Sequence, residues 1–251
     1  MKKNELIEFL DEYLKISDYP NDDSKNGFQV DSDRQEIKKI GYAVDATSYI
    51  FDKAIKENVD MIICHHGLFW WLDLVVVGTH HNRLTKLIKN DIALYGCHLP
   101  LDAHEEVGNN IVMLNKFVEM MRVENPEIKQ DGHAFWLKFK EWIVLSDVME
   151  IYCNGIWIIW ELYNFWKKEE INSIYFDSGG WLYTAKIAKE NNYDLLITWE
   201  WPHRDIVNAK EIWQSIVLWW HYETEVFGVQ ALAEKLNKDF GVDIVFLDEK
   251  Y

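Results

Sequence analysis

The fold is decided by residues 40–66, IGYAVDATSYIFDKAIKENVDMIICHH. Apolar side chains fill residues 40–44 and again 61–64, as expected of buried strands. Between the two runs, residues 48–57 place their apolar side chains at helical spacing. A strand, a helix and a second strand in this order predict two parallel strands joined by a right-handed crossover.

The same alternation continues on both sides of this stretch. Residues 4–14 have the apolar spacing of an amphipathic helix, and residues 28–30 form a short strand pattern. Downstream, a strand pattern at 92–96 is followed by a polar loop and by a helical pattern at 110–121. The first half of the chain therefore predicts an α/β domain.

A polar segment at 122–133 is the expected domain boundary, because such segments connect compact domains. Beyond it, strand patterns such as 171–176 and a helical pattern at 184–190 predict a smaller α/β domain. The last block, 214–251, repeats the strand, helix and strand order of the first domain. The predicted fold class is therefore α/β, with two α/β domains that have mixed or parallel sheets, the second domain inserted into the first.

Composition narrows the functional class. The 251 residues carry 26 Lys and Arg against 42 Asp and Glu, a formal charge of -16 that disfavours binding to polyanions. The cysteines, Cys64, Cys97 and Cys153, form no CxxC pair and are odd in number, which suits a reducing, cytoplasmic compartment. The sequence has no run of 18 apolar residues, and acidic residues interrupt its first apolar stretch, so we expect neither a membrane span nor a signal peptide.

The strongest chemical signal is the pair His65 and His66 at the end of the apolar run 61–64. Ligands of open α/β sheets bind at the carboxyl ends of the strands, where two adjacent imidazoles can meet an ion or a substrate. The alternative is a pair of strand-end histidines whose rings are hydrogen-bonded to backbone carbonyls.

The next predicted strand ends in a second polar segment, Cys97 to His104, with the sequence CHLPLDAH. Asp102 follows a turn made rigid by Pro100 and can present its carboxylate beside His65 and His66. Alternatively, Asp102 caps the following segment. We expect His104, which precedes two glutamates, to be solvated rather than to bind a metal.

A third polar segment, WHYETE at 220–225, follows the apolar run 216–218. If a helix begins near Tyr222, His221 and Glu225 are four residues apart and share one helix face. This spacing is typical of a metal-binding pair at the start of a helix. A helix cap with a surface glutamate is the alternative.

Together these residues offer imidazoles and carboxylates but no thiolate, a set that suits Zn, Fe, Mn or Ni. A catalytic zinc site keeps three protein ligands and an open position, so this set is too large for one ion. Two ions that share Asp102 or Glu225 as a bridge would account for all of them. Such a site generates a hydroxide nucleophile and stabilises an oxyanion.

These motifs resemble the Nif-three-like family, whose members are called GTP cyclohydrolase I type 2 homologues. The resemblance lies in HHGL at 65–68, HLPLDAH at 98–104, GNN at 108–110 and HYETE at 221–225, and extends to NGFQV at 26–30. It implies a two-domain α/β protein that forms a ring-shaped homohexamer with metal ions facing an inner cavity. The second domain then corresponds to residues 126–213, between metal-binding parts at 1–125 and 214–251.

The resemblance also implies roles for particular residues. The metal ligands of the dinuclear centre would be His65, His66, Asp102, His221 and Glu225. His98 falls on the histidine before the Pro-Leu-Asp turn and would orient Asp102 or a water molecule. Glu200 matches the glutamate of a Thr-Gly-Glu element and would face the metal cavity, so Glu200 and His98 are the candidate catalytic residues.

Tryptophans replace glycines of the family pattern at two of these motifs. Trp199 precedes Glu200 and Trp220 precedes His221, and the chain as a whole has 13 Trp and 12 Gly. Glycine at such turns allows a positive φ or a close backbone approach, which an indole side chain disfavours. We therefore hypothesise that some tryptophans occupy positions suited to glycine. The alternative is that they are core or interface aromatics, as expected above all for Trp70.

Three functions are compatible with these residues. The first is a metal-dependent hydrolase that acts on a nucleotide or a pterin-like ring, although the chain has no GxxxxGK[ST] loop. The second is a non-enzymatic metal-binding module that acts as an interaction or regulatory scaffold. The third is a ring that binds nucleic acid, which would require Arg83, Lys86 and Lys89 to form a basic surface despite the acidic net charge.

Overall fold

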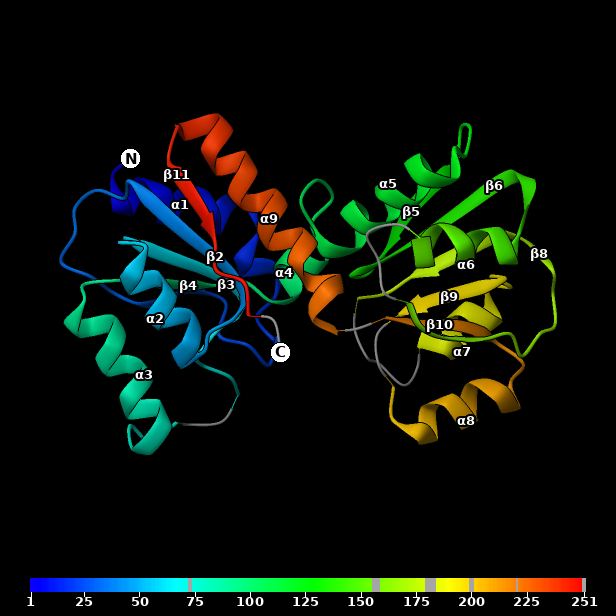
Figure 1. Ribbon diagram of the computed structural model, residues 1–251, viewed down its shortest axis with the longest axis horizontal. Helices are drawn as coiled ribbons and strands as arrows, with labels where there is room; N and C mark the ends of the chain where they lie inside the picture. Colours follow the sequence, from blue (N-terminus) through cyan, green and yellow to red (C-terminus); the bar gives the residue numbers. More distant parts are fainter. Residues whose placement is uncertain (72–73, 155–158, 179–183, 199–200, 220, 250–251) are drawn as a thin grey trace. The chain divides into compact units, whose positions relative to one another are not determined.

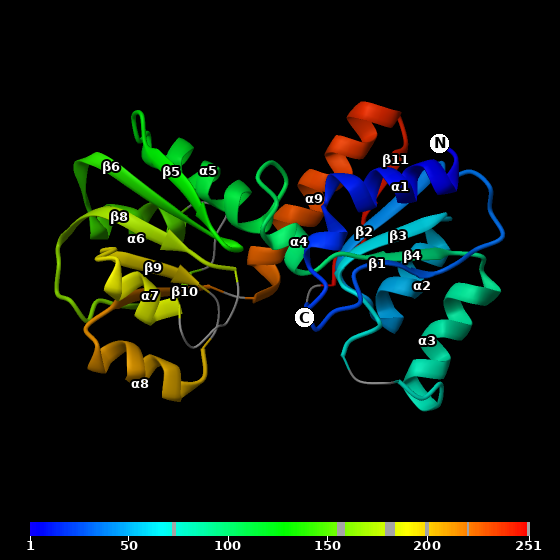
Figure 2. The same cartoon turned by 180° about the vertical axis from the view of Figure 1, so that it is seen from behind.

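The computed structural model describes residues 1–71, 74–154, 159–178, 184–198, 201–219 and 221–249. The chain forms two compact units, the first from Met1–Gly108 and Val226–Tyr251 and the second from Asn109–Glu225. Each unit is a layered α/β structure, drawn in Figure 1 and from behind in Figure 2. In the described part of the chain, no helix has the length and apolarity needed to cross a bilayer.

The first unit contains a mixed sheet with the strand order β1-β4-β3-β2-β11. Strands β2, β3, β4 and β11 run parallel, and β1 pairs antiparallel with β4. Its elements are α1 (Lys3–Tyr13), the 3-10 turn η1 (Ile16–Asp18), β1 (Gly27–Val30), β2 (Lys39–Asp45), α2 (Ser48–Lys56), β3 (Met61–His66), α3 (Gly78–Lys89), β4 (Ala93–Gly96), α4 (Leu99–Asp102), most of α9 (His221–Phe240) and β11 (Asp243–Phe246).

Helices cover both faces of this sheet, with α2 and α3 on one face and α1 and α9 on the other (Figures 1 and 2). Phe51 of α2 and Leu87 of α3 are fully buried in one core cluster with Ile62 and Cys64 of β3. On the opposite face, the apolar stripe of α1 is buried, as its helical spacing predicts. Strand β3, buried along nearly its whole length, is the centre of the unit.

The second unit also contains a mixed sheet, with the order β5-β6-β8-β9-β10-β7. Strands β8, β9 and β10 run parallel, and the others are antiparallel to their neighbours. Its elements are α5 (Asn109–Met121), β5 (Glu127–Asp131), β6 (Ala134–Val144), α6 (Leu145–Asn154), β7 (Ile159–Tyr163), β8 (Glu170–Phe176), α7 (Thr184–Glu190), β9 (Leu195–Thr198), α8 (His203–Glu211) and β10 (Ser215–Trp219).

One helix-to-strand junction occurs in both units. Asn58 and Asn192 follow α2 and α7 with φ of 54° and 57°, the left-handed conformation that asparagine tolerates. Two residues later, Asp60 and Asp194 are buried and accept hydrogen bonds from backbone N–H groups that lead into the neighbouring strand. The junction thus fixes how each central strand, β3 or β9, enters its sheet.

The structure confirms the predicted α/β class, but the bounds of the two units differ from those predicted from the sequence. Strand β10 pairs with β9 and β7 of the second sheet, so it lies in the second unit rather than in the expected 214–251 block. The units also change at 108/109 and 225/226 rather than at 125/126 and 213/214. The reason is physical: an apolar run of strand type predicts burial, and it fits the interior of either sheet equally well.

Candidate metal centre

The candidate metal centre of the first unit lies where parallel strands β2, β3 and β4 end side by side. Asp45, the last residue of β2, is in register with His66, the last residue of β3. His98 follows the end of β4 by two residues. The topology therefore brings the polar residues after these strands to one edge of the sheet, as the sequence predicts.

His65 is fully buried, and its ring is oriented by a backbone group. Its Nδ1 atom lies 2.9 Å from the carbonyl oxygen of Cys97. Because a carbonyl oxygen only accepts hydrogen bonds, Nδ1 carries the proton and the lone pair of the neutral ring is on Nε2. This is the tautomer in which Nε2 can bind a metal ion.

His66 and His98 have the same orientation, with carboxylates as acceptors. The Nδ1 atom of His66 lies 2.9 Å from Oδ1 of Asp45, and that of His98 lies 2.8 Å from Oδ1 of Asp22. A histidine that binds a metal typically donates its other N–H to a carboxylate or a carbonyl in this way. One ligand atom from each of the three histidines lies within 4.8 Å of the other two.

Asp102 adds a carboxylate to these imidazoles. It ends the short helix α4 and is 2% exposed. Its Oδ2 lies 3.6 Å from Nε2 of His65, slightly wider than the roughly 3.0–3.4 Å expected between two ligands of one ion. The structure therefore brings His65, His66, His98 and Asp102 together.

Two residues of this region, Asp22 and Asp45, were not predicted from the sequence. Burial raises the pKa of Asp22, but hydrogen bonding to His98, the charge of His98 and hydrogen bonds from Asn26 and the Ser24 N–H outweigh it, so the pKa is lowered overall. Asp45 could have been found, because it ends a predicted parallel strand. Asp22 lies in a polar segment without periodicity, where nothing in the sequence indicated it.

Trp70 borders the same cluster. Its ring centroid lies 5.1 Å from that of His98 and 5.8 Å from that of His66, and its Nε1 donates to the Gly67 carbonyl at 3.0 Å. The indole is half-buried, so it acts as a wall of the candidate site rather than as a core residue.

The two thiols beside the site are not arranged as ligands. Cys64 and Cys97 are fully buried, and their Sγ atoms donate to the carbonyls of Tyr95 and Cys64. Burial, with the charge of neighbouring groups as a lesser cause, raises the pKa of both thiols. The donor set is therefore imidazole and carboxylate, which fits Zn, Fe, Mn or Ni better than a thiolate-selective ion.

His221 and Glu225 form a second group, at the start of α9 in the second unit. The helix begins at His221, and the Nε2 of this residue lies 3.2 Å from Oε2 of Glu225. Glu225 is fully buried, whereas the His221 side chain is 39% exposed. The predicted shared helix face is therefore present, and a buried carboxylate of this kind requires a cationic partner or hydrogen bonds.

Two residues considered in the sequence, His104 and Glu200, are not placed in either group. His104 is half-buried, not solvated: its Nε2 donates to the Tyr13 carbonyl, and its Nδ1 accepts from the N–H groups of Glu106 and Val107. Burial is the main cause that lowers its pKa. Glu200 lies outside the described residues, as do Trp199 and Trp220.

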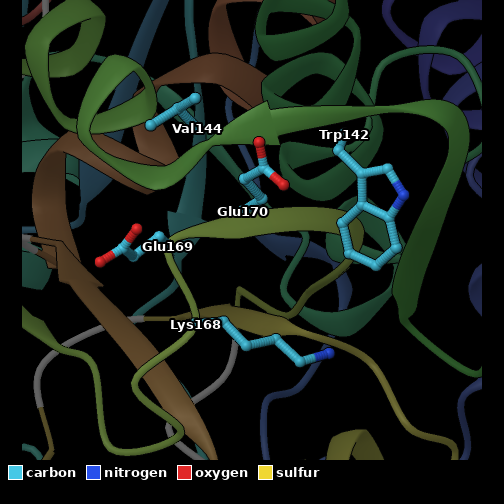
Figure 3. Close-up of a pocket in the computed structure, with 5 residues that line it drawn as sticks. All are labelled: Trp142, Val144, Lys168, Glu169 and Glu170. Carbon is cyan, nitrogen blue, oxygen red and sulfur yellow. The ribbon is translucent and has the colours of Figure 1, made fainter.

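A separate pocket of about 490 Å³ lies in the second unit (Figure 3). It is lined by Trp142 and Val144 of β6, by Glu170, the first residue of β8, and by Lys168 and Glu169, which precede that strand. Lys168 already pairs with Asp194. With neither imidazole nor thiol in its lining, this pocket lacks the donor set of the first unit and is a poorer candidate for metal chemistry.

Comparisons with known proteins agree with the fold and the motifs. A "GTP cyclohydrolase 1 type 2 homolog" from Pyrococcus horikoshii is 37% identical over 252 residues, covering 99% of this chain and 98% of that protein. The crystal structure of TTHA1606 from Thermus thermophilus matches 100% of this chain and 99% of its own, with a TM-score of 0.85 and 34% identity. Reduced HcgD from Methanocaldococcus jannaschii covers 99% and 98%, with a TM-score of 0.82 and 28% identity.

The family described as Duf34/NIF3 (NGG1p interacting factor 3) matches residues 1–251, the full length of the sequence. This match confirms the resemblance that the histidine and carboxylate motifs indicated. The chain belongs to the DUF34/NIF3 family.

Proposed function

We propose that this protein holds two divalent transition-metal ions and acts as a metal-dependent hydrolase. The ligands would be His65, His66, Asp102, His221 and Glu225. The observation that carries the proposal is the shared orientation of the three clustered imidazoles, each with Nδ1 next to an oxygen acceptor. This hydrogen bonding leaves Nε2 as the basic atom of each neutral ring, which is the state that a metal ligand requires.

When bound, the ions would polarise a substrate oxygen and make a water molecule acidic enough to attack near neutral pH. His65 and Asp102, both buried, would hold the reacting groups away from bulk water. His98 would accept or deliver a proton at Nε2, because its Nδ1 donates to Asp22 and the lone pair of the ring is then on Nε2. Glu200 is the second candidate for proton transfer. The names of curated relatives point to a nucleotide or a related ring as substrate.

Elemental analysis tests the dinuclear site. Protein purified without added metal or chelator should contain about two transition-metal equivalents per chain. The double variant His65→Ala, Glu225→Ala should lose them while circular dichroism shows a folded protein. As a matched control, His81→Ala, Glu190→Ala removes the same residue types from exposed positions and should retain the metal. Fewer than about 0.2 equivalents in the parent protein, unchanged after soaking with Mn, Fe or Zn, contradicts the proposal.

A non-enzymatic metal-binding or regulatory scaffold is the alternative that shares every ligand. Metal-loaded protein and the double variant His65→Ala, Glu225→Ala can be compared in a hydrolysis screen over nucleotides and pterin-like rings. Turnover that disappears with the metal supports the hydrolase, whereas stable metal binding without turnover supports the scaffold.

The nucleic-acid alternative is weakened by the contacts of its expected basic surface. Lys86 is paired with Asp52 and donates to the Ser48 carbonyl, and Arg83 lines a pocket beside His66. An affinity for DNA that decreases steeply with salt concentration would support this alternative. A cytoplasmic homohexameric ring stays part of the proposal, and sedimentation equilibrium of the full chain tests the hexamer.

A further inference from the structure

A pocket of about 300 Å³ opens beside the candidate metal centre, within the first unit. His66 and Trp70 line it on the side of the centre, and Asp45 and Thr47 line it at the end of β2. Arg83 of α3 also lines it. The pocket therefore combines a candidate metal ligand with a permanently charged guanidinium group.

Arg83 has no ion-pair partner among the residues that the structure describes. Its Nε atom is buried and has no hydrogen-bond partner there either. The next cation on the same helix, Lys86, behaves differently, since its Nζ lies 2.6 Å from Oδ2 of Asp52. The chain has 42 Asp and Glu residues that could pair with Arg83. A buried N–H group without an acceptor, such as the Nε–H of Arg83, lowers the stability of the fold.

The nearby carboxylate and hydroxyl groups are engaged elsewhere. Asp45 accepts from Nδ1 of His66, and the Thr47 hydroxyl donates to Oε2 of Glu249 at 2.7 Å. The guanidinium therefore lines a pocket in which no described side chain forms an ion pair with it, the Asp45 carboxylate of the same lining included. Guanidinium groups bind carboxylates and phosphates through two parallel hydrogen bonds, which makes an oxyanion the matching ligand.

We propose that Arg83 binds an oxyanion of the substrate, a phosphate or a carboxylate, in the pocket next to His66. The inference rests on the proposed function in one respect, because His66 would hold the metal ion that the rest of the substrate approaches. Arg83 would set specificity by selecting molecules with an oxyanion and by fixing their distance from the centre. It is a binding residue and not a metal ligand.

Isothermal titration calorimetry with inorganic phosphate, repeated with acetate, tests the proposal and separates the two anions. The parent protein, Arg83→Gln and Arg83→Lys are compared at low ionic strength after elemental analysis of each sample. Arg83→Gln should weaken binding of the preferred anion about ten- to a hundredfold. Arg83→Lys should restore part of it, because the charge returns without the bidentate geometry.

Lys86→Gln is the matched control, because it removes a cation from the same helix whose charge is already paired. It should change the affinity less than about twofold. Equal affinities in Arg83→Gln and the parent protein, or no binding by the parent at about 10 mM of either anion, would overturn the proposal.

The metal content keeps the two proposals distinguishable. If the parent protein contains two equivalents of metal and phosphate binds equally well to the parent and to Arg83→Gln, the anion site is refuted and the metal site is supported. If the protein contains no metal but its anion binding is weakened by Arg83→Gln, the anion site is supported and the metal proposal is contradicted.

Discussion

Asp45 and His66 are register partners across two parallel strands, and Oδ1 of Asp45 lies 2.9 Å from Nδ1 of His66. Both residues end internal strands, so the backbone hydrogen bonds of the sheet determine how the carboxylate meets the ring. The orientation of His66 is thus a property of the sheet, and it does not depend on a mobile loop.

Removing this carboxylate should weaken metal binding. Asp45→Ala deprives His66 of its acceptor, so the ring can rotate or carry its proton on Nε2. We expect a loss of about 10- to 100-fold in metal affinity. Competition with a chromophoric chelator measures it. Asp52→Ala is the control, because it removes an exposed carboxylate that pairs with Lys86. Equal affinities in the two variants would mean that Asp45 does not position a ligand.

Asp22 predicts a pH dependence of stability in metal-free protein. Its pKa is lowered on folding, so its contribution is present above the unfolded value near 3.9 and is lost as pH falls through the folded value. Urea unfolding of the parent protein and Asp22→Asn at pH 6 and at about pH 3 compares the two conditions. The variant should be less stable at pH 6, and the difference should shrink in acid. A difference that is constant with pH would assign the effect to packing.

Trp213 is the clearest case of a tryptophan in a position suited to glycine. It has φ of 59° and is 58% exposed, at the junction between α8 and β10. Equivalent junctions have Asn58 and Asn192. Trp213→Gly should raise the free energy of unfolding by about 1 kcal/mol, because glycine adopts this conformation without strain.

Trp142→Gly serves as the counterpart. Trp142 is 54% exposed but lies in β6, without a positive φ, so its replacement should lower stability by about 0.5–1 kcal/mol. Chemical denaturation measures the free energy of unfolding of both variants and of the parent protein. If Trp213→Gly is also destabilising, contacts of the indole outweigh the backbone strain.

The buried thiols should resist modification. Cys64 and Cys97 are fully buried, so a thiol reagent at pH 8 should react with them only through unfolding of the native protein. A Cys153→Ser background restricts the signal to these two residues. Their reaction should be much slower than in denaturant. Rapid labelling of the native protein would show that the ends of β3 and β4 open locally.

Much of the fold could be predicted because its signals are local. The apolar run that becomes β3 and the helical spacing of α2 specify their own structure, and the rule for parallel strand ends then places His65, His66 and Asp102 together. Strand β10 was assigned to the wrong block because hydrophobicity indicates burial but does not identify the sheet. Asp22 was missed because only the folded chain brings it to His98, which is 76 residues away.

The internal position of β2, β3 and β4 has a further consequence. Each of these strands is hydrogen-bonded on both sides, so His65 and His66 at the end of β3 and Asp45 at the end of β2 are held in place before any ion arrives. A preformed set of nitrogen and oxygen donors binds several divalent ions, and their affinities follow the Irving–Williams order whichever ion the function requires. Which metal the protein carries in a cell would then depend on which ion the cell supplies, so that protein from different growth media could contain different metals on an unchanged scaffold.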